Sequence, residues 1–165
     1  MSTPALILTC SLIAMGTFLL WEFIAWFTHK YIMHGLLWSW HKSHHTVHHH
    51  ALERNDLFAL VFSLPCVGLF YYFTLVTYNP YMLAAAIGIF CYGAFYVVFH
   101  DIIVHQRIRW RIIKKSRYLK RMIHAHYVHH SRHTQAGCEA FGFLYAPKKY
   151  DTQELTDKAS RQQTQ

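Results

Sequence analysis

Histidine is the residue type with the most evident chemistry in this chain, which contains 15 histidines among 165 residues. Ten fall in four short clusters that read HKYIMH, HKSHH, HDIIVH and HYVHH. In chain order the spacings are H-x4-H, H-x2-HH, H-x4-H and H-x2-HH. Because the same pair of spacings occurs twice, we predict one site built from both halves of the chain, with these candidate ligands: His29, His34, His41, His44, His45, His100, His105, His126, His129 and His130.

The spacings agree with metal binding. On an α-helix, residues i, i+3 and i+4 share a face, so each H-x2-HH cluster presents three imidazoles to one place. At about 100° per residue, the two rings of an H-x4-H pair lie roughly 140° apart, so they serve two metals or straddle a helix end. Ten neutral imidazoles exceed the roughly four ligands of a zinc ion, and we therefore expect two metal ions. Imidazole binds zinc, copper, iron and nickel, so ligand type does not choose the metal.

The remaining histidines have weaker claims. His48 and His133 follow His44 and His129 by four residues, and they would extend the ligand face if the helices continue. We interpret His49, His50 and His124 as solvated or interfacial.

Three apolar stretches must position the clusters. Residues 4–27, 57–78 and 81–99 contain a single charged residue, Glu22, and each approaches or exceeds the roughly 20 residues that span a bilayer. Charged residues make up only 15% of the chain, against about 25% in soluble proteins. The sequence predicts an all-α integral membrane protein with three spans, and it leaves open a fourth, re-entrant segment within 102–123. We assign 1–147 to a single domain and 148–165 to a disordered polar tail.

Basic residues indicate the orientation. They lie between the first two spans and after the third, so the N-terminus is predicted outside and both histidine-rich regions at the cytoplasmic face. The basic run 106–121 is expected to contact anionic lipid headgroups or an acidic electron donor. Nucleic acid is a poor partner for a run that joins a membrane span directly. The candidate contacts are Arg107, Arg109, Arg111, Lys114 and Lys115.

Together with the flanking motifs NDLFA and EAFGFLYAP, the four clusters resemble the bacterial-type β-carotene 3-hydroxylases of the fatty acid hydroxylase superfamily. The resemblance covers about residues 15–147. It implies that the ten clustered histidines bind two non-haem irons that activate O2, with zinc able to replace iron in a recombinant protein. It also implies hydroxylation of carotenoid β-ionone rings at carbon 3, from β-carotene through β-cryptoxanthin to zeaxanthin, with 4-keto carotenoids as further candidates. Electrons would come from NADH or NADPH through a ferredoxin-type partner. The linker TVHHHALER departs from the Pro- and basic-rich pattern of the family.

Other residues are candidates for supporting roles. Glu22 could accept the second ring N–H of His29, or form an interhelical hydrogen bond without a metal role. Asp101, Asp56 and Asn55 are further acceptors, and we expect the partner of Asp101 to lie in a cluster other than its neighbour His100. Six aromatic residues near the predicted interface could line a ring pocket or form an ordinary interfacial belt: Trp26, Tyr31, Trp38, Trp40, Tyr96 and Phe99.

Two alternative functions remain open from the residues alone. A carotenoid ketolase, or a fatty acid or sterol hydroxylase, would use the same histidine clusters. A metal transporter would place its ligands at mid-membrane depth, whereas these clusters follow the apolar stretches.

Overall fold

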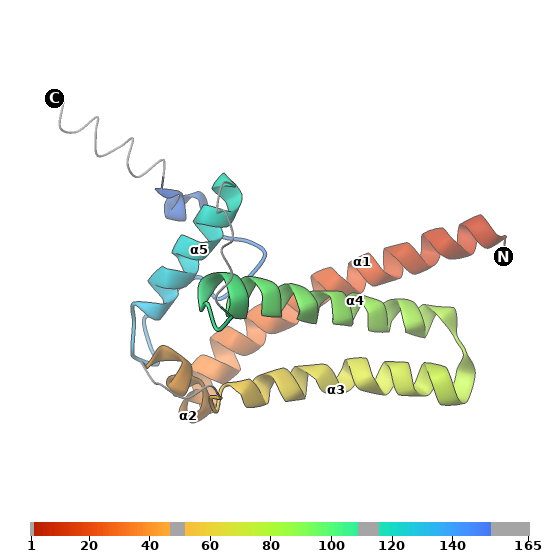
Figure 1. Ribbon diagram of the computed structural model, residues 1–165, viewed down its shortest axis with the longest axis horizontal. Coiled ribbons are helices and arrows are strands. Elements are labelled where there is room, and N and C mark those ends of the chain that lie inside the picture. The colour runs from red at the N-terminus through yellow and green to blue at the C-terminus, as the bar shows by residue number, and fades with distance from the viewer. Residues whose placement is uncertain (1, 47–51, 109–115, 153–165) are drawn as a thin grey trace.

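The computed structural model describes residues 2–46, 52–108 and 116–152 (Figure 1). Every regular element in these ranges is helical, which confirms the predicted all-α class. Three long helices form an elongated bundle, and short elements gather at the end opposite the N-terminus (Figure 1). The long helices are α1 (Thr3–Phe27), α3 (Asp56–Tyr72) and α4 (Pro80–Tyr96). The short elements are α2 (Trp38–His41), η2 (Lys42–His45), α5 (Arg117–His130) and η5 (Lys148–Tyr150).

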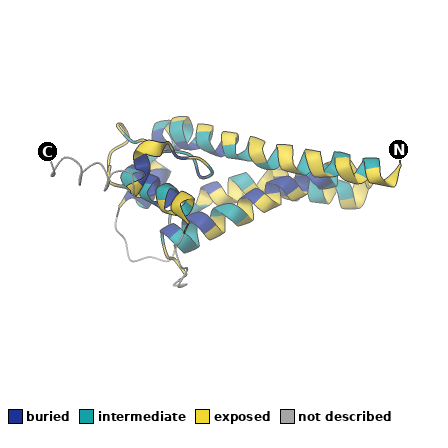
Figure 2. Ribbon diagram, turned by 90° about the horizontal axis from the view of Figure 1, so that it is seen from above, coloured by how far each residue is buried: buried dark blue, intermediate teal, exposed yellow. Residues whose placement is uncertain are grey.

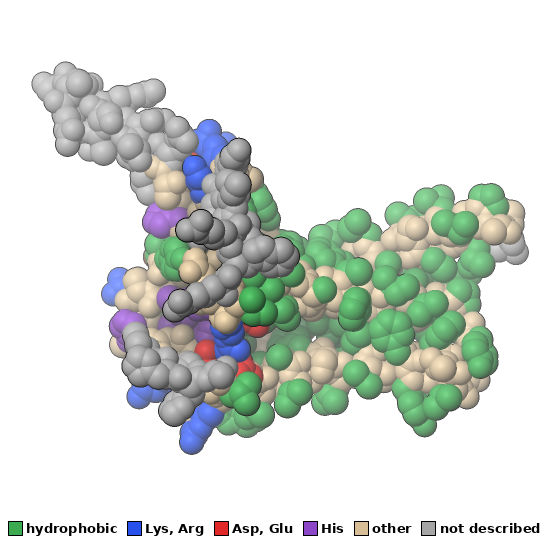
Figure 3. Space-filling model, in the orientation of Figure 1, with side chains coloured by type: hydrophobic (Ala, Val, Ile, Leu, Met, Phe, Trp, Pro, Cys, Tyr) green, Lys and Arg blue, Asp and Glu red, His purple; other side chains and the backbone are tan. Residues whose placement is uncertain are grey.

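Each long helix continues into a π-helical segment: η1 (Thr28–Leu36), η3 (Phe73–Thr77) or η4 (Val97–Val104). The combined helices Thr3–Leu36, Asp56–Thr77 and Pro80–Val104 are long and apolar enough to cross a membrane, which confirms three spans. In Figure 3, hydrophobic side chains cover these helices, while charged and histidine side chains gather at one end. No fourth candidate span occurs in the described part of 102–123, and residues 109–115 lie outside the described ranges.

Close helix packing fixes the relation of α1 to α4. A Cβ added to Gly88 of α4 would lie 2.4 Å from the Ala14 carbonyl oxygen and 2.9 Å from the Thr17 Cβ. Only glycine allows this approach, because any side chain would overlap the α1 backbone. Figure 2 shows the result as buried residues between the long helices and exposed residues on their outer sides.

The π-helical segment η1 contains His29 and His34, whereas η4 contains His100 and ends directly before His105. The His105 N–H donates to the His100 carbonyl oxygen at 2.9 Å, and the Leu37 N–H donates to that of Ile32 at 2.8 Å. These i to i−5 bonds widen the turn, and they bring residues five apart onto one face. The separation of roughly 140° expected for an α-helix is therefore wrong for both pairs.

The last described residues pack against α5. Tyr150 is 5% exposed, and its carbonyl oxygen accepts a hydrogen bond from His124 Nδ1 at 2.9 Å. Asp151 pairs with Arg117 of α5 at 2.7 Å. The assignment of a disordered tail from residue 148 is thus wrong for 148–152, because Tyr150 supplies an apolar anchor. Residues 153–165 lie outside the described ranges.

Candidate metal centre

The ten clustered histidines assemble into two groups of five at the end of the bundle. Within each group, the five potential ligand atoms lie within 4.8 Å of one another. All ten histidines are buried except His105 and His130, which are partly exposed. Group one consists of His29, His34, His41, His45 and His129, and group two of His44, His100, His105, His126 and His130.

Each group draws histidines from three of the four clusters. Both members of an H-x4-H pair join the same group, because the π-turn puts them on one face. Each H-x2-HH cluster is divided: its i and i+4 histidines join one group and its i+3 histidine joins the other. Thus His44 crosses to group two, while His129 crosses to group one. The expectation that each H-x2-HH cluster serves one place is therefore wrong, and the shared clusters tie the two groups together.

Hydrogen bonds from Nδ1 orient the rings of group one. Backbone carbonyl oxygens of Phe141, Gln135, Arg132 and Glu139 accept from His29, His34, His45 and His129 at 2.8–3.1 Å. The fifth ring, that of His41, contacts Asn55 Oδ1 at 2.7 Å. A neutral imidazole that donates from Nδ1 presents an unprotonated Nε2. All five Nε2 lone pairs are therefore available on the inner side of the group.

Facing lone pairs make group one suitable for a cation. His34 Nε2 and His129 Nε2 lie 3.2 Å apart, although both rings donate from Nδ1 to a carbonyl and neither Nε2 can donate to the other. A metal–nitrogen bond of about 2.1 Å separates two ligands at right angles by about 3.0 Å, and two tetrahedral ligands by about 3.4 Å. Five pairs of Nε2 atoms in the two groups lie 2.9–3.2 Å apart. These spacings are close to those between two ligands of one bound metal ion.

Group two has charged acceptors. His44 Nδ1 contacts Glu53 Oε2 at 3.2 Å, and His100 Nδ1 contacts Asp101 Oδ1 at 2.7 Å. Their Nε2 atoms face each other at 2.9 Å. Among the described residues, the buried His126 Nδ1 and His130 Nε2 have no hydrogen-bond partner. A buried nitrogen without a partner is costly in an apolar surrounding, so an ion at His130 Nε2 would relieve this.

Burial keeps the imidazoles neutral. It is the largest cause that lowers the pKa of His41 to about 2, of His129 to about 3 and of His45 to about 4, from an ordinary 6.5. In group two, burial and the neighbouring His100 lower the pKa of His105 to about 3. Because the neutral ring is the form that binds metals, these four histidines are in the required state at neutral pH.

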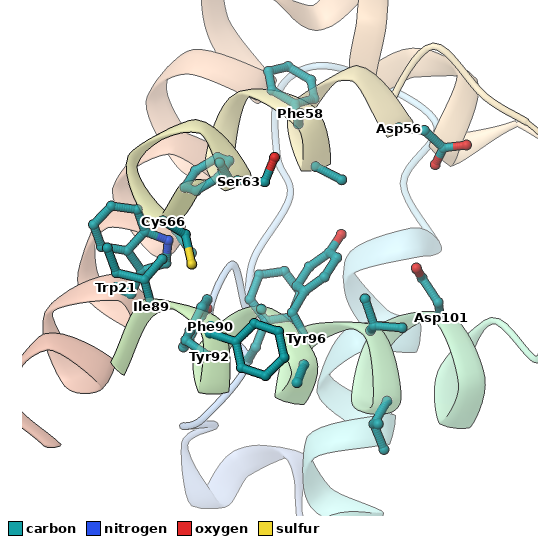
Figure 4. A pocket seen from close by; sticks show the side chains of 18 of the residues that line it. Trp21, Asp56, Phe58, Ser63, Cys66, Ile89, Phe90, Tyr92, Tyr96 and Asp101 are labelled. Atoms are coloured by element: carbon teal, nitrogen blue, oxygen red, sulfur yellow. The ribbon is translucent and has the colours of Figure 1, made fainter. Parts of the chain in front are cut away.

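An apolar cavity of about 540 Å³ between α1, α3 and α4 reaches His29 of group one. Its size lies within the roughly 300–1,000 Å³ of small-molecule pockets. The lining includes His29 of group one and Asp101, the partner of His100 in group two. Figure 4 shows Asp56 and Asp101 at one end, Trp21, Cys66 and Ile89 at the other, and the Tyr96 ring between them. The main apolar residues of the wall are Trp21, Phe58, Phe62, Ile89, Phe90 and Phe143.

The sequence profile of the fatty acid hydroxylase family matches residues 14–147. The chain belongs to this family. It is 43% identical to a β-carotene hydroxylase of Paracoccus sp. (strain N81106 / MBIC 01143), over 85% of this chain and 86% of that protein. It is 41% identical to a β-carotene hydroxylase of Pseudescherichia vulneris, over 94% and 84% of the two chains. The chloroplastic β-carotene 3-hydroxylase 2 of Arabidopsis thaliana is 33% identical over 85% of this chain and 48% of its own. No solved structure matches significantly.

In this member of the hydroxylase family, two of the four predicted acceptors contact cluster histidines. Asn55 contacts His41. Asp101 contacts its neighbour His100, which corrects the expectation of a partner in another cluster, because η4 is not a regular α-helix. Asp56 contacts no cluster histidine; it pairs with Arg107 at 2.8 Å and accepts from the Glu53 N–H at 2.9 Å.

Glu22 forms the interhelical hydrogen bond that was its second predicted contact, with Tyr92 of α4. Glu22 does not contact His29, whose Nδ1 is taken by Phe141. Its carboxylate accepts from Tyr92 of α4 and from two backbone N–H groups of the C-terminal segment. Sequence reasoning missed Glu53, which lies two residues before the motif NDLFA. It also missed the carbonyl acceptors, since backbone atoms leave no signal in residue types.

Of the six predicted aromatic residues, only Tyr96 lines the cavity. Trp26 and Tyr31 lie beneath the Lys30 ammonium group, as expected for an interfacial belt. Trp38 packs against the rings of His34 and His45, Trp40 against Phe58, and Phe99 against Phe95 in the core.

The basic residues and remaining histidines also have definite places. Arg107 pairs with Glu53 at 2.6 Å and with Asp56 at 2.8 Å. The residue is still exposed, and its contact with lipid or an electron donor stays a prediction. His133 contacts the His45 carbonyl oxygen, and His124 that of Tyr150; neither joins a histidine group. Predictions for Arg109, Arg111, Lys114, Lys115 and His48–His50 lie outside the described residues.

Proposed function

We propose that the chain is a membrane β-carotene hydroxylase, an oxidoreductase that converts a ring C–H bond at carbon 3 into an alcohol. The observation that carries the proposal is an apolar cavity between three candidate spans, lined by His29 of group one and by Asp101, the hydrogen-bond partner of His100 in group two. The similarity to bacterial β-carotene hydroxylases over most of both chains supports the carotenoid substrate.

The residues present fit two iron ions, one held by group one and one by group two. Bound iron supplies the activation of O2 that cleavage of an unreactive C–H bond requires. One oxygen atom enters the C–H bond, and the other is reduced to water with two electrons and two protons. The electrons come from NADH or NADPH through a ferredoxin-type partner. Zinc can take the place of iron in a recombinant preparation, because it stands above Fe²⁺ in the affinity order.

The chain itself binds and orients the ring. A carotenoid in the bilayer can enter between α1, α3 and α4 without leaving the membrane. The apolar wall binds the methylated ring and excludes water, while Phe143 and Tyr96 limit its approach beside His29 and His100. Entry of one end at a time allows both rings of β-carotene to react in turn, giving β-cryptoxanthin and then zeaxanthin. A 4-keto ring is a further candidate for the same cavity.

We place the protein in the bacterial inner membrane, with its N-terminus outside and the histidine groups at the cytoplasmic face. The basic residues between the first two spans and after the third support this orientation. Anionic lipids and an acidic electron donor are the expected partners of the cytoplasmic end. Since the histidines gather at one end of the spans (Figure 3), the arrangement argues against a transporter with mid-membrane ligands.

The decisive experiment is pigment analysis after expression in cells that accumulate β-carotene. We expect products with one or two added oxygen atoms and an unchanged hydrogen count. Products that lack two hydrogens for each added oxygen would identify a ketolase. Unchanged β-carotene in the presence of iron-loaded protein would reject the proposal and point to acyl or sterol substrates.

A matched pair of glycine variants tests the cavity. Added Cβ atoms at Gly93 and Gly68 would each meet nothing within 4 Å, but only Gly93 lines the cavity. G93L should fill the cavity and lower hydroxylation at least tenfold without altering iron content, whereas G68L should retain wild-type turnover. Equal turnover in the two variants would show that the ring binds elsewhere.

A further inference from the structure

The carboxylate of Glu22 connects three parts of the chain. Its Oε1 accepts hydrogen bonds from the Phe143 N–H at 2.8 Å and the Leu144 N–H at 2.9 Å. Its Oε2 accepts one from the Tyr92 hydroxyl at 2.8 Å. Glu22 therefore links α1 to α4 and to residues 139–144, which we call the clamp loop. An ionisable residue within a membrane span is a functional candidate by default.

The clamp loop in turn orients group one. The carbonyl oxygen of Glu139 accepts from His129 Nδ1 at 2.8 Å, and that of Phe141 accepts from His29 Nδ1 at 2.9 Å. The Phe143 ring stacks on His29, with 5.7 Å between centroids and 7° between planes. The same ring forms part of the cavity wall. Displacement of the loop would therefore change the orientation of the His29 and His129 rings and the shape of the cavity at the same time.

The fit between Glu22 and the loop leaves no spare room. A Cβ added to Gly142 would lie 2.9 Å from Glu22 Oε1, which is closer than such contacts normally occur. Glycine at 142 allows the carboxylate to reach the two following N–H groups. This explains in physical terms why the motif EAFGFLYAP has glycine between its two phenylalanines.

We propose that Glu22 is a positioning residue of the metal centre. It fixes the clamp loop so that His29 and His129 donate from Nδ1 to the loop carbonyls and direct Nε2 towards the ion of group one. The inference rests on the proposed function only in requiring that group one binds a metal. Because it positions both His29 and the Phe143 side chain of the cavity wall, Glu22 also helps to orient the carotenoid ring relative to the metal.

Iron binding by purified full-length variants tests the proposal without reference to turnover. In E22L both N–H groups of the loop lose their acceptor, so we expect group one to bind iron roughly 10- to 100-fold more weakly, as for other residues that orient metal ligands. E22Q should rescue binding, because its amide oxygen can accept from both N–H groups and its NH₂ can donate to Tyr92. Chelator competition with elemental analysis gives the number and affinity of bound ions.

Two further variants separate positioning from folding. Y92F removes the bond to α4 but keeps both bonds to the loop, so its iron affinity should match the wild type. G142A keeps the carboxylate but requires its flexible end to shift away from the added Cβ, so its iron affinity should fall in the same direction as in E22L; this variant decides if E22L fails to fold. Wild-type affinity in folded E22L or G142A, or a Y92F defect equal to that of E22L, would overturn the proposal. A wild-type chain that binds fewer than two irons would instead reject the proposed function.

Discussion

The two histidine groups are alike in origin but differ in what holds their rings. Each group contains both histidines of one H-x4-H cluster and the first and last histidines of one H-x2-HH cluster. Its fifth member is the middle histidine of the other H-x2-HH cluster. In group one, the outer nitrogens donate to four backbone carbonyls and one side-chain amide, all neutral. In group two, the rings of His44 and His100 contact the carboxylates of Glu53 and Asp101. The sites are therefore similar in ligands and unequal in charge.

This difference assigns different tasks to the surrounding residues. A carbonyl acceptor fixes the tautomer and direction of an imidazole, whereas a carboxylate also raises its basicity as a ligand. An ion in group two would thus lie in the more negative surrounding, and the two irons of the loaded protein should be distinguishable. The neutral acceptors of group one lie mainly at residues 132–141, so this group depends on the fold of the C-terminal segment.

Removal of one ligand from each group should have the largest effect. His126 and His129 belong to the same cluster, but they lie in groups two and one. H126A and H129A should each abolish hydroxylation and bind one iron fewer than the wild type, while both remain in the membrane. Mössbauer spectra of the ⁵⁷Fe-loaded variants should retain different signals. Retained turnover in H129A would refute its role as a ligand, and identical residual spectra would refute the division into two groups.

Acid should affect both groups in the same direction, since each group contains histidines with a lowered pKa. In the metal-free protein, burial lowers the pKa of His41, His45, His105 and His129 to between about 2 and about 4. Between those values and 6.5 the unfolded chain binds more protons than the folded one. The free energy of unfolding should therefore fall as pH drops from 6.5 towards 4, by at most roughly 1.4 kcal/mol per pH unit for each histidine.

Thermal unfolding in detergent at pH 7.5, 6 and 5 measures this effect. Iron-loaded protein should lose less stability over the same interval, because a bound ion holds the rings unprotonated. A metal-free protein as stable at pH 5 as at pH 7.5 would contradict the buried, neutral state of the rings.

Loss of one carboxylate should weaken iron binding by group two and leave iron binding by group one unchanged. E53Q replaces the charged acceptor of His44 with a neutral one, and we expect a roughly 10- to 100-fold loss of iron affinity at one site. D56N is the matched control: Asp56 pairs with the same Arg107 but contacts no cluster histidine. Chelator competition should separate the two variants, and equal losses would assign the effect to Arg107 instead of His44.

Residue types and periodicity predicted the three spans and the ten histidines that the structure brings together. Long apolar stretches and histidine clusters are local signals, which do not depend on distant contacts. The division of HKSHH and HYVHH between groups was not predictable, because it depends on how α2, η2 and α5 face each other. The π-turns after α1 and α4 also escaped prediction, since a 100° period was assumed for H-x4-H.

The supporting residues were the hardest to predict. Glu22 was singled out as the charge within a span, but its acceptor role toward residues 143 and 144 joins positions more than 120 apart in the chain. Glu53 gave no periodic signal, and the carbonyl partners of group one have none in principle. Five of six aromatic residues chosen near the interface missed the cavity, because its wall lies deeper along α1, α3 and α4.

The smallest expected effect comes from giving group one a charged hydrogen-bond acceptor like those of group two. Asn55 Oδ1 lies 2.7 Å from His41 Nδ1, and Asn55 is 5% exposed. N55D would place a carboxylate there with almost no change in shape, and the negative charge should stabilise the ion of group one. We expect full iron loading, turnover within a few fold of the wild type, and Mössbauer signals of the two irons closer together than in the wild type.

Because N55A removes the acceptor without adding charge, it should weaken iron binding and leave the two signals apart. If N55D and N55A shift the spectrum alike, the charge of the acceptor is not what distinguishes the groups, and the geometry of the ligands must be.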